Sequence, residues 1–315
     1  MPVTGSWNTY WEGPHANAAY SSGGAGHPGI LSFWSDYFRE LQVREDSPRI
    51  VDIASGNGAV VGYAKIAFDE QLPEFTCLDV SSAAIDMLKS RFPDVDGIVA
   101  DANTIPLESG AYDVAASQFG LEYAGLDALE EVVRLLSDNG ELVLMLHHRG
   151  GSIFEHCNAN LEAIRELQIS RFIPLCIAMF DTGFASLKSG DRSDYSAAEK
   201  NLAPAITAME AIFAKHGMDI ADGTVVGLYR DVRDMHSRLR HYEPDEVGGW
   251  LSKMQGEVDA YEGRMASMCD AAIDAAAFDA LRLSISDKGL AIIKGEALEI
   301  SGDQLPIAWI LIARK

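Results

Sequence analysis

Residues 49–61 constrain the fold more than any other part of this 315-residue chain. They read Arg-Ile-Val-Asp-Ile-Ala-Ser-Gly-Asn-Gly-Ala-Val-Val, an apolar β-branched run followed by small residues and a second apolar run. The first run predicts a buried strand, and the small residues predict a tight turn into a helix that begins near Ala59. Gly56 and Gly58 lack a Cβ, so a ligand can approach the backbone there, and the following helix N-terminus favours an anionic group.

Two more predicted strands also end in an acidic residue. The second strand, residues 75–80, ends at Asp79 and Val80. Asp79 lies ~20 residues beyond the glycine loop, where a carboxylate can accept hydrogen bonds from ribose hydroxyls. The third strand, residues 97–102, ends in Asp101 and Ala102. An alternative for Asp79 is a purely structural role as the acid at a helix start.

A fourth predicted strand begins near Ala111 and leads into a loop with three polar or aromatic candidates, Gln118, Glu122 and Tyr123. In open α/β sheets, ligands bind outside the carboxyl ends of the strands, so we expect this loop to face the reacting group. Alternatively, Glu122 and Tyr123 only start the helix predicted over residues 126–137.

A fifth predicted strand covers residues 140–149 after a turn over residues 137–140. His147 and His148 lie at its carboxyl end, where an imidazole could accept a proton from a substrate. Successive side chains on a strand point to opposite faces, so at most one of the two should face the site. A hydrogen-bonded structural histidine is the alternative.

Strand patterns stop over residues 150–270, and helical periodicity takes their place over three segments, residues 153–169, 197–216 and 245–271. This insertion is too long for a simple connection and predicts a helical subdomain. Its apolar side chains could roof a substrate pocket or form the insertion's own core, and His156 is a candidate substrate contact. Two closing strands, residues 289–300 and 306–315, predict an antiparallel hairpin.

The N-terminal segment is aromatic and rich in turn residues, with Tyr10, Trp11 and Tyr20 ahead of an amphipathic helix predicted over residues 28–43. This segment is either a short helix pinned to the core by its aromatic side chains or a lid over a bound cofactor. Tyr10 and Tyr20 are therefore candidate cofactor contacts, and Trp11 is a candidate substrate contact.

The charge, cysteine content and hydropathy of the chain limit the classes of molecule it is expected to bind and the compartment it is expected to occupy. A net charge of -22 and the absence of any basic run disfavour nucleic acid, and favour a small neutral or cationic molecule or a protein partner. The four cysteines are scattered without a metal-ligand spacing or a disulfide framework, which favours a reducing cytoplasm and no metal. No stretch approaches the ~20 apolar residues of a membrane span, and the N-terminus lacks signal-peptide features. We therefore expect a soluble cytoplasmic protein, with a homodimer left open.

The glycine loop resembles the first motif of class I S-adenosylmethionine-dependent methyltransferases, an acid followed by G-x-G-x-G. Asp52 matches the acid, Ala54 stands at the first glycine, and Gly56 and Gly58 match the later ones. The dinucleotide fingerprint G-x-G-x-x-G would instead need a third glycine where this chain has Val61. The terminal hairpin is similar to the end of the methyltransferase fold, in which a reversed seventh strand is inserted beside the fifth.

The resemblance implies an α/β fold with a doubly wound, mostly parallel seven-stranded sheet, a C-terminal antiparallel hairpin and a helical insertion serving as a substrate lid. It implies S-adenosylmethionine as the cofactor. The expected domains are residues 1–45 (aromatic cap and helix), 46–150 with 280–315 (cofactor-binding core) and 151–279 (insertion).

The site residues carried over from the resembled family form a large set. Asp52, Ala54, Ser55, Gly56 and Gly58 would hold the methionine part, Asp79 and Val80 the ribose side, and Asp101 and Ala102 the adenine, with Gln118 a further cofactor contact. The candidates for a catalytic base are His147, His148 and Glu122, and Tyr123 would contact substrate. The reaction would be in-line displacement on the sulfonium methyl by an O-, N- or S-nucleophile of a small molecule.

Three other functions remain open at this point. The first is an NAD(P)-dependent oxidoreductase, and the second is an enzyme of the same fold that uses the cofactor without transferring methyl. The third is a non-catalytic module that senses S-adenosylmethionine or S-adenosylhomocysteine.

Overall fold

The computed structural model describes residue 11 and residues 27–69, 73–300 and 302–315. Its contacts divide the chain into two compact units. The first unit holds the described residues up to Glu155 together with Ser267–Lys315, and the second holds His156–Ala266. Each unit has its own apolar core and is described by itself.

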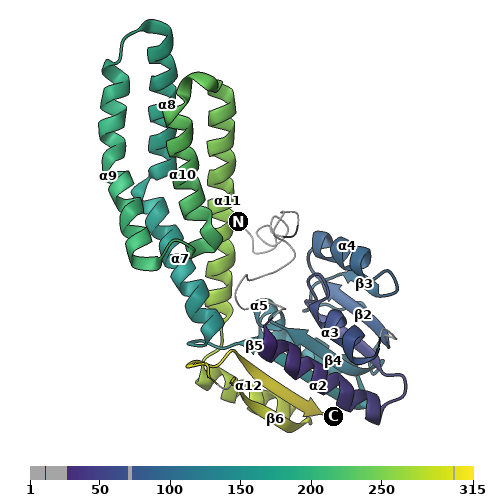
Figure 1. Ribbon diagram of the computed structural model, residues 1–315. Helices are drawn as coiled ribbons and strands as arrows, with labels where there is room; N and C mark the ends of the chain where they lie inside the picture. Colours follow the sequence, from purple (N-terminus) through teal and green to yellow (C-terminus); the bar gives the residue numbers. More distant parts are fainter. Residues whose placement is uncertain (1–10, 12–26, 70–72, 301) are drawn as a thin grey trace. The chain divides into compact units, whose positions relative to one another are not determined.

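In the described part of the first unit, seven strands form one sheet in the order β3-β2-β1-β4-β5-β7-β6 (Figure 1). They are β1 (Arg49–Ile53), β2 (Glu74–Asp79), β3 (Asp96–Val99), β4 (Tyr112–Gln118), β5 (Leu136–His147), β6 (Ala291–Leu298) and β7 (Ala308–Arg314). Strands β1 to β5 run parallel, whereas β7 lies antiparallel between β5 and β6. The predicted doubly wound sheet with its terminal hairpin is confirmed.

The helices of this unit are α2 (Pro28–Arg44), α3 (Ala59–Ala67), α4 (Ser82–Arg91), α5 (Leu121–Ala124), α6 (Leu129–Leu135) and α12 (Ala275–Asp287). The amphipathic pattern of α2 buries Trp34 and Phe38 completely, and their rings stack at a centroid distance of 5.6 Å. Phe38 also packs on Phe75 of β2, which anchors the helix to the sheet. Ser81 caps α4 by accepting a hydrogen bond from the Ala84 N–H.

Three element boundaries differ from the sequence predictions. Strand β3 ends at Val99, so Asp101 lies in the turn after the strand and not at its last position. Strand β5 already begins at Leu136, because an irregularity in its pairing with β4 absorbs the polar residues 137–140 that predict a turn. The helix predicted over residues 126–137 is a 3₁₀ turn, Leu126–Ala128, followed by the short α6.

The chain leaves the sheet after β5 and returns to it at Ile273. The His147 carbonyl accepts a hydrogen bond from the Ile273 N–H, and the Ile273 carbonyl accepts one from the Arg149 N–H. The Arg149 guanidinium donates to the carbonyls of Cys269 and Ala272. These bonds close the base of the long insertion within the first unit.

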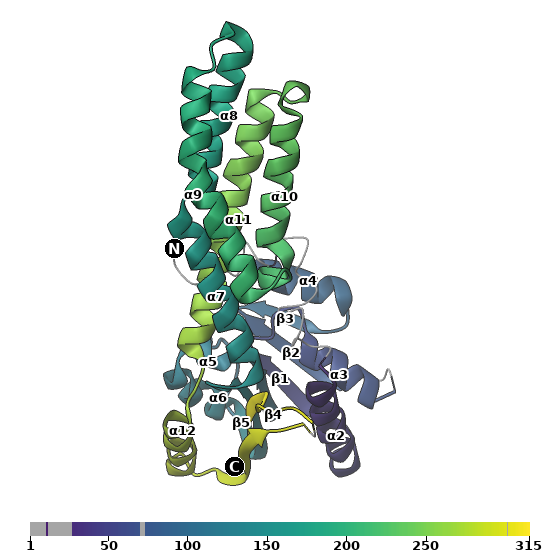
Figure 2. The same ribbon diagram turned by 60° about the vertical axis from the view of Figure 1, so that its left-hand side comes forward.

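The second unit is entirely helical. It contains α8 (Phe172–Ser189), α9 (Ser193–His216) and α10 (Thr224–Ser237), together with most of α7 (Ser152–Ser170) and α11 (Pro244–Ala271) (Figure 2). The helices predicted over residues 153–169, 197–216 and 245–271 are confirmed, while α8 and α10 are additional. Whether the insertion acts as a lid stays a prediction. None of the helices in the described part of the chain has the length and apolarity needed to cross a bilayer.

Candidate functional site

The loop between β1 and α3 has a left-handed backbone at three positions. Gly56 and Gly58 have φ angles of 53° and 84°, and the non-glycine residue Ala54 has a φ of 53°. The positive φ at both glycines confirms the reason inferred for their presence. A left-handed alanine costs about 1–2 kcal/mol, and such strain concentrates at functional sites. The N-cap residue of α3 is Gly58, which has no side chain to bond the first N–H groups of the helix, and a helix N-terminus of this kind favours an anion.

The loop after β4 touches this glycine loop. A Cβ added to Gly120 would lie 2.6 Å from the Ala54 Cβ and 2.8 Å from the Ala54 carbonyl oxygen. The Ser117 hydroxyl reinforces the contact, because it donates to the Ile53 carbonyl at 2.8 Å and accepts from the Leu121 N–H. Since β1 and β4 flank the point where the strand order reverses, the two loops lie at the position where such sheets bind ligands.

Asp79 connects the glycine loop to the end of β2. Its Oδ2 accepts a hydrogen bond from the Gly56 N–H at 2.8 Å, and its Oδ1 accepts one from the Ser81 N–H at 2.9 Å. Burial raises the pKa of Asp79 above its ordinary value in spite of these donors, which favour the ionised form. Each carboxylate oxygen has two lone pairs, so Asp79 keeps acceptor capacity for a ligand hydroxyl.

Asp52 is a buried carboxylate that has no hydrogen-bond partner within the described part of the chain. Its side chain lies in β1 with 1% of the residue exposed, and neither oxygen forms a hydrogen bond to another described residue. Burial, with a smaller contribution from the charge of Asp79, raises the pKa of Asp52 well above its usual range. An unpaired buried acid is costly unless a ligand supplies a cation or a donor.

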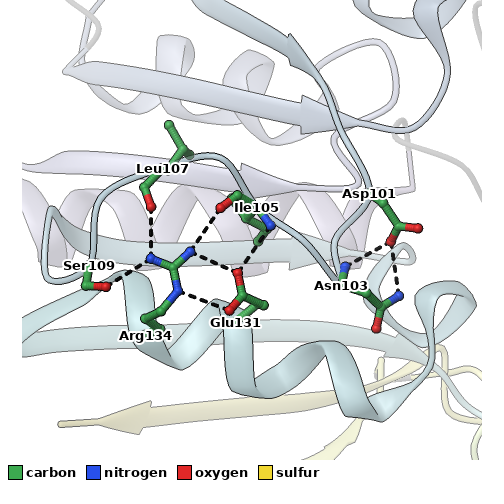
Figure 3. Close-up of polar contacts among 7 residues, drawn as sticks. All are labelled: Asp101, Asn103, Ile105, Leu107, Ser109, Glu131 and Arg134. Carbon is green, nitrogen blue, oxygen red and sulfur yellow. Dashed lines mark hydrogen bonds and ion pairs between the residues drawn. The ribbon is translucent and has the colours of Figure 1, made fainter.

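Asp101 and Ala102 lie at the start of the loop between β3 and β4. Ala102 is buried, whereas Asp101 is exposed and uses only Oδ1, which accepts from the backbone and side-chain amides of Asn103 (Figure 3). The Asn103 side chain also donates to the Ala124 carbonyl, which joins this loop to the end of α5.

The rest of that loop is fastened by Arg134 of α6. Its guanidinium donates to the carbonyls of Ile105 and Leu107 and to the Ser109 hydroxyl, at 2.8–3.0 Å (Figure 3). Arg134 also pairs with Glu131, and this pairing holds the pKa of Glu131 below its usual value. Glu131 in turn accepts from the Ile105 N–H. Neither residue carries a sequence motif, so the sequence analysis did not identify them.

Two further candidates lie against the glycine loop and β2. Val80, directly after β2, is 45% exposed, so its side chain is accessible to a flat apolar ring. The Trp11 ring lies on the glycine loop, since a Cβ at Gly56 would come within 2.9 Å of Trp11 Cζ2. Ser55 is buried, and its N–H bonds to the Leu78 carbonyl. Tyr10 and Tyr20 lie outside the described residues.

Gln118 is held by aromatic side chains. Its Oε1 accepts a hydrogen bond from the Trp34 indole of α2. The Tyr63 hydroxyl also bonds to Gln118, although burial dominates and raises the pKa of Tyr63 to about 12. The amide of Gln118 therefore joins α2 and α3 to the end of β4 by hydrogen bonds.

Glu122 and His147 form a buried pair behind the β4 loop. Glu122 Oε1 accepts from the His147 backbone N–H at 2.9 Å and lies 2.7 Å from His147 Nδ1. The His147 side chain is completely buried, with the Phe119 ring at a centroid distance of 4.4 Å and the Tyr123 ring edge-on at 5.7 Å. The carboxylate fixes the orientation of the imidazole and favours a proton on Nδ1.

His148 contacts a different set of residues, as the alternation along a strand predicts. Its imidazole stacks on the Trp309 indole at 4.1 Å, and Trp309 stacks on Phe278 of α12 at 4.3 Å. Burial lowers the pKa of His148 in spite of opposing backbone hydrogen bonds. His156 belongs to the helical unit, where its Nε2 lies 3.1 Å from the Asn160 side-chain amide.

The donor set suits S-adenosylmethionine better than a metal or a nicotinamide dinucleotide. Asp52 offers an unpaired anion beside a helix N-terminus that favours an anion, which matches the ammonium and carboxylate of an amino acid. Among the described residues, no group of three His, Cys, Asp or Glu side chains could hold a metal ion. The four cysteines are free and buried.

Comparison with known proteins gives the same assignment. Residues 51–144 match the family model described as a methyltransferase domain. An uncharacterized methyltransferase of Schizosaccharomyces pombe is 30% identical over 174 residues, which cover 54% of this chain and 67% of that protein. The ubiquinone/menaquinone biosynthesis C-methyltransferase of Campylobacter jejuni is 29% identical over 130 residues, 37% of this chain and 55% of the relative.

The chain thus spans about half to two thirds of the length of these relatives. A solved S-adenosylmethionine-dependent methyltransferase from Mesorhizobium loti is 21% identical over 38% of this chain and 56% of its own, with a TM-score of 0.31. The sequence match, the sheet order and the glycine loop agree with one another. The chain belongs to the class I S-adenosylmethionine-dependent methyltransferases.

Proposed function

We propose that this protein transfers the methyl group of S-adenosylmethionine to a small molecule. The observation that carries the proposal is the unpaired carboxylate of Asp52, fully buried beside the glycine loop. A buried anion that lacks a protein partner is stabilised when a ligand ammonium pairs with it. Asp52 and the helix N-terminus after Gly58 would bind the two charged ends of the methionine part.

The remaining cofactor contacts follow from the loop geometry. Asp79 holds the glycine loop through the Gly56 N–H and would accept from ribose hydroxyls with its other lone pairs. Val80 would cover one face of the adenine, and the unused Oδ2 of Asp101 would accept from its amino group. S-Adenosylmethionine supplies an electrophilic methyl group, so alignment of the acceptor and exclusion of water are the main tasks of the chain.

The Glu122–His147 pair is the candidate for proton acceptance. Glu122 orients the imidazole through two contacts from one oxygen, the arrangement in which an acid supports a general base. We predict that His147→Asn lowers kcat while the cofactor still binds. A loss of cofactor binding with an unchanged kcat would assign His147 to loop structure instead.

The acceptor class rests on charge and on the relatives. The net charge of -22 opposes a phosphate backbone, and the Campylobacter jejuni relative bears the name of a C-methyltransferase of quinone biosynthesis. An activated ring carbon therefore joins oxygen, nitrogen and sulfur nucleophiles as a possible target.

Calorimetric titration of the full chain with S-adenosylhomocysteine tests the proposal, with NADH as the competing ligand. We expect micromolar binding of the adenosyl ligand, a loss of at least about tenfold in affinity in Asp52→Asn, and no heat with NADH. Binding of NADH without binding of the adenosyl ligand would contradict the proposal and would indicate that the glycine loop binds a dinucleotide. Release of S-adenosylhomocysteine during turnover with an acceptor separates an enzyme from a sensor.

A further inference from the structure

The helical unit contains a cavity of about 160 Å³ between α8, α9 and α10. Its apolar wall is formed by Phe172, Met179, Leu202, Ile206 and Val232. An apolar cavity of ~150 Å³ takes up a molecule the size of benzene, whereas sites for larger ligands have volumes of about 300 Å³ or more. The size of this cavity therefore suits a single aromatic ring.

The helix α9, which forms one wall of the cavity, contains a proline. Pro204 lies inside α9, between the lining residues Leu202 and Ile206. Its ring removes the N–H that would bond to the Lys200 carbonyl and pushes that carbonyl away, which bends a helix. Pro204 thus lies at the level of the cavity wall.

Most polar groups at the rim of the cavity satisfy one another. His236 Nε2 lies 2.6 Å from the Tyr195 hydroxyl and 3.4 Å from Glu199 Oε1. Glu199 also faces the Arg192 guanidinium at 3.8 Å. Among the lining residues, His236 and Glu199 are thereby matched, and the Tyr229 hydroxyl contacts Glu210.

Arg233 differs from these groups. Arg233 lines the cavity from α10 and is exposed to solvent, and no hydrogen bond or ion pair joins it to another residue in the described part of the chain. A guanidinium that is unpaired beside an apolar cavity favours a planar anion, because its fork of N–H groups matches a carboxylate.

We propose that this cavity is a binding site for a compact aromatic carboxylate, with the ring between α8, α9 and α10 and the carboxylate on Arg233. The site lies wholly within the helical unit. Its occupancy does not depend on methyl transfer, so it can be tested without the cofactor and independently of the proposed function.

The test is calorimetric titration of the full chain with phenylacetate and with its neutral isostere phenylacetamide. We expect phenylacetate to bind at least about tenfold more tightly, because a charge-assisted hydrogen bond contributes more than a neutral one. Arg233→Gln should abolish that preference and leave the amide affinity unchanged. Arg230→Gln is the matched control, since Arg230 lies on the same helix but does not line the cavity.

A second variant tests the cavity itself. Val232→Phe fills the space with a ring and should abolish binding of both probes, while circular dichroism verifies that the helices remain folded. The proposal is overturned if neither probe binds at millimolar concentration. It is also overturned if phenylacetate keeps its advantage in Arg233→Gln, or if Val232→Phe binds as the unsubstituted protein does.

Discussion

Replacement of Gly120 by alanine tests whether the β1 and β4 loops meet as described. The new Cβ would lie 2.6 Å from the Ala54 Cβ, whereas ordinary contacts begin at 3.4 Å, so the loops must separate by 0.8 Å. The second neighbour, at 2.8 Å, is the Ala54 carbonyl oxygen, and backbone cannot rotate away as a side chain can. Such overpacking costs roughly 1–3 kcal/mol of unfolding free energy.

The same displacement should weaken the cofactor site. A shift of ~1 Å in a positioned site can cost ~100-fold in function, so we expect Gly120→Ala to reduce affinity for S-adenosylhomocysteine by at least about tenfold. Urea unfolding measures the stability and calorimetry the affinity.

Gly62→Ala provides the matched control for this variant. A Cβ at Gly62 meets only the Phe92 ring, at 3.8 Å, and the residue lies inside α3. Alanine should therefore stabilise the helix by up to ~1 kcal/mol and leave binding unchanged. Wild-type stability and affinity in Gly120→Ala would refute the contact between the two loops.

Three more predictions follow from the buried charges and the loop contacts. Asp52→Asn should raise the melting temperature of the cofactor-free protein, because burial raises the pKa of Asp52 and its ionised form is costly at pH 7. Each ~1 kcal/mol of added unfolding free energy should raise the melting temperature by on the order of 2–4 °C. A lower melting temperature would contradict this prediction. Hydrogen bonds from Arg44 and Arg314 hold the pKa of Glu141 below its ordinary value of 4.5 in spite of burial. The stabilising contribution of Glu141 is therefore present above pH 4.5 and lost as the pH falls through the folded pKa. Urea unfolding from pH 3 to pH 7 should show that loss, and Glu141→Gln should flatten it. Arg134→Met should weaken S-adenosylhomocysteine binding by ~1 kcal/mol through the β3–β4 loop, whereas the exposed Arg39→Met should change it by less than ~0.5 kcal/mol.

The sheet could be predicted because its signals are local. Buried parallel strands form continuous β-branched runs, and the glycine loop and Ser81 mark the adjoining helix starts within a few residues. Strand β5 extended further than predicted because residues 137–140 form a polar bulge, and polar loop residues look alike in a bulge and in a turn.

The contacts that shape the site could not be predicted from the sequence. Arg134 reaches a loop 25–29 residues away, and nothing in its neighbours distinguishes it from a solvated helix arginine. Glu122 and His147 were both candidates, but their pairing depends on the register that brings α5 against the end of β5. Gly120 was overlooked because its role is a close approach in space, which no spacing along the chain encodes.

The hydrogen bonds between His147, Arg149 and Ile273 bring the two ends of the insertion together at one point of the core. The chain leaves the sheet and returns to it at one point. The conformational entropy lost when the insertion orders is therefore independent of the pairing of β5 with β7. A short linker joining Arg149 to Ile273 would leave every strand register intact. In evolutionary terms, the cofactor-binding core and the inserted helices can diverge at different rates, and one core can carry successive helical insertions without being refolded.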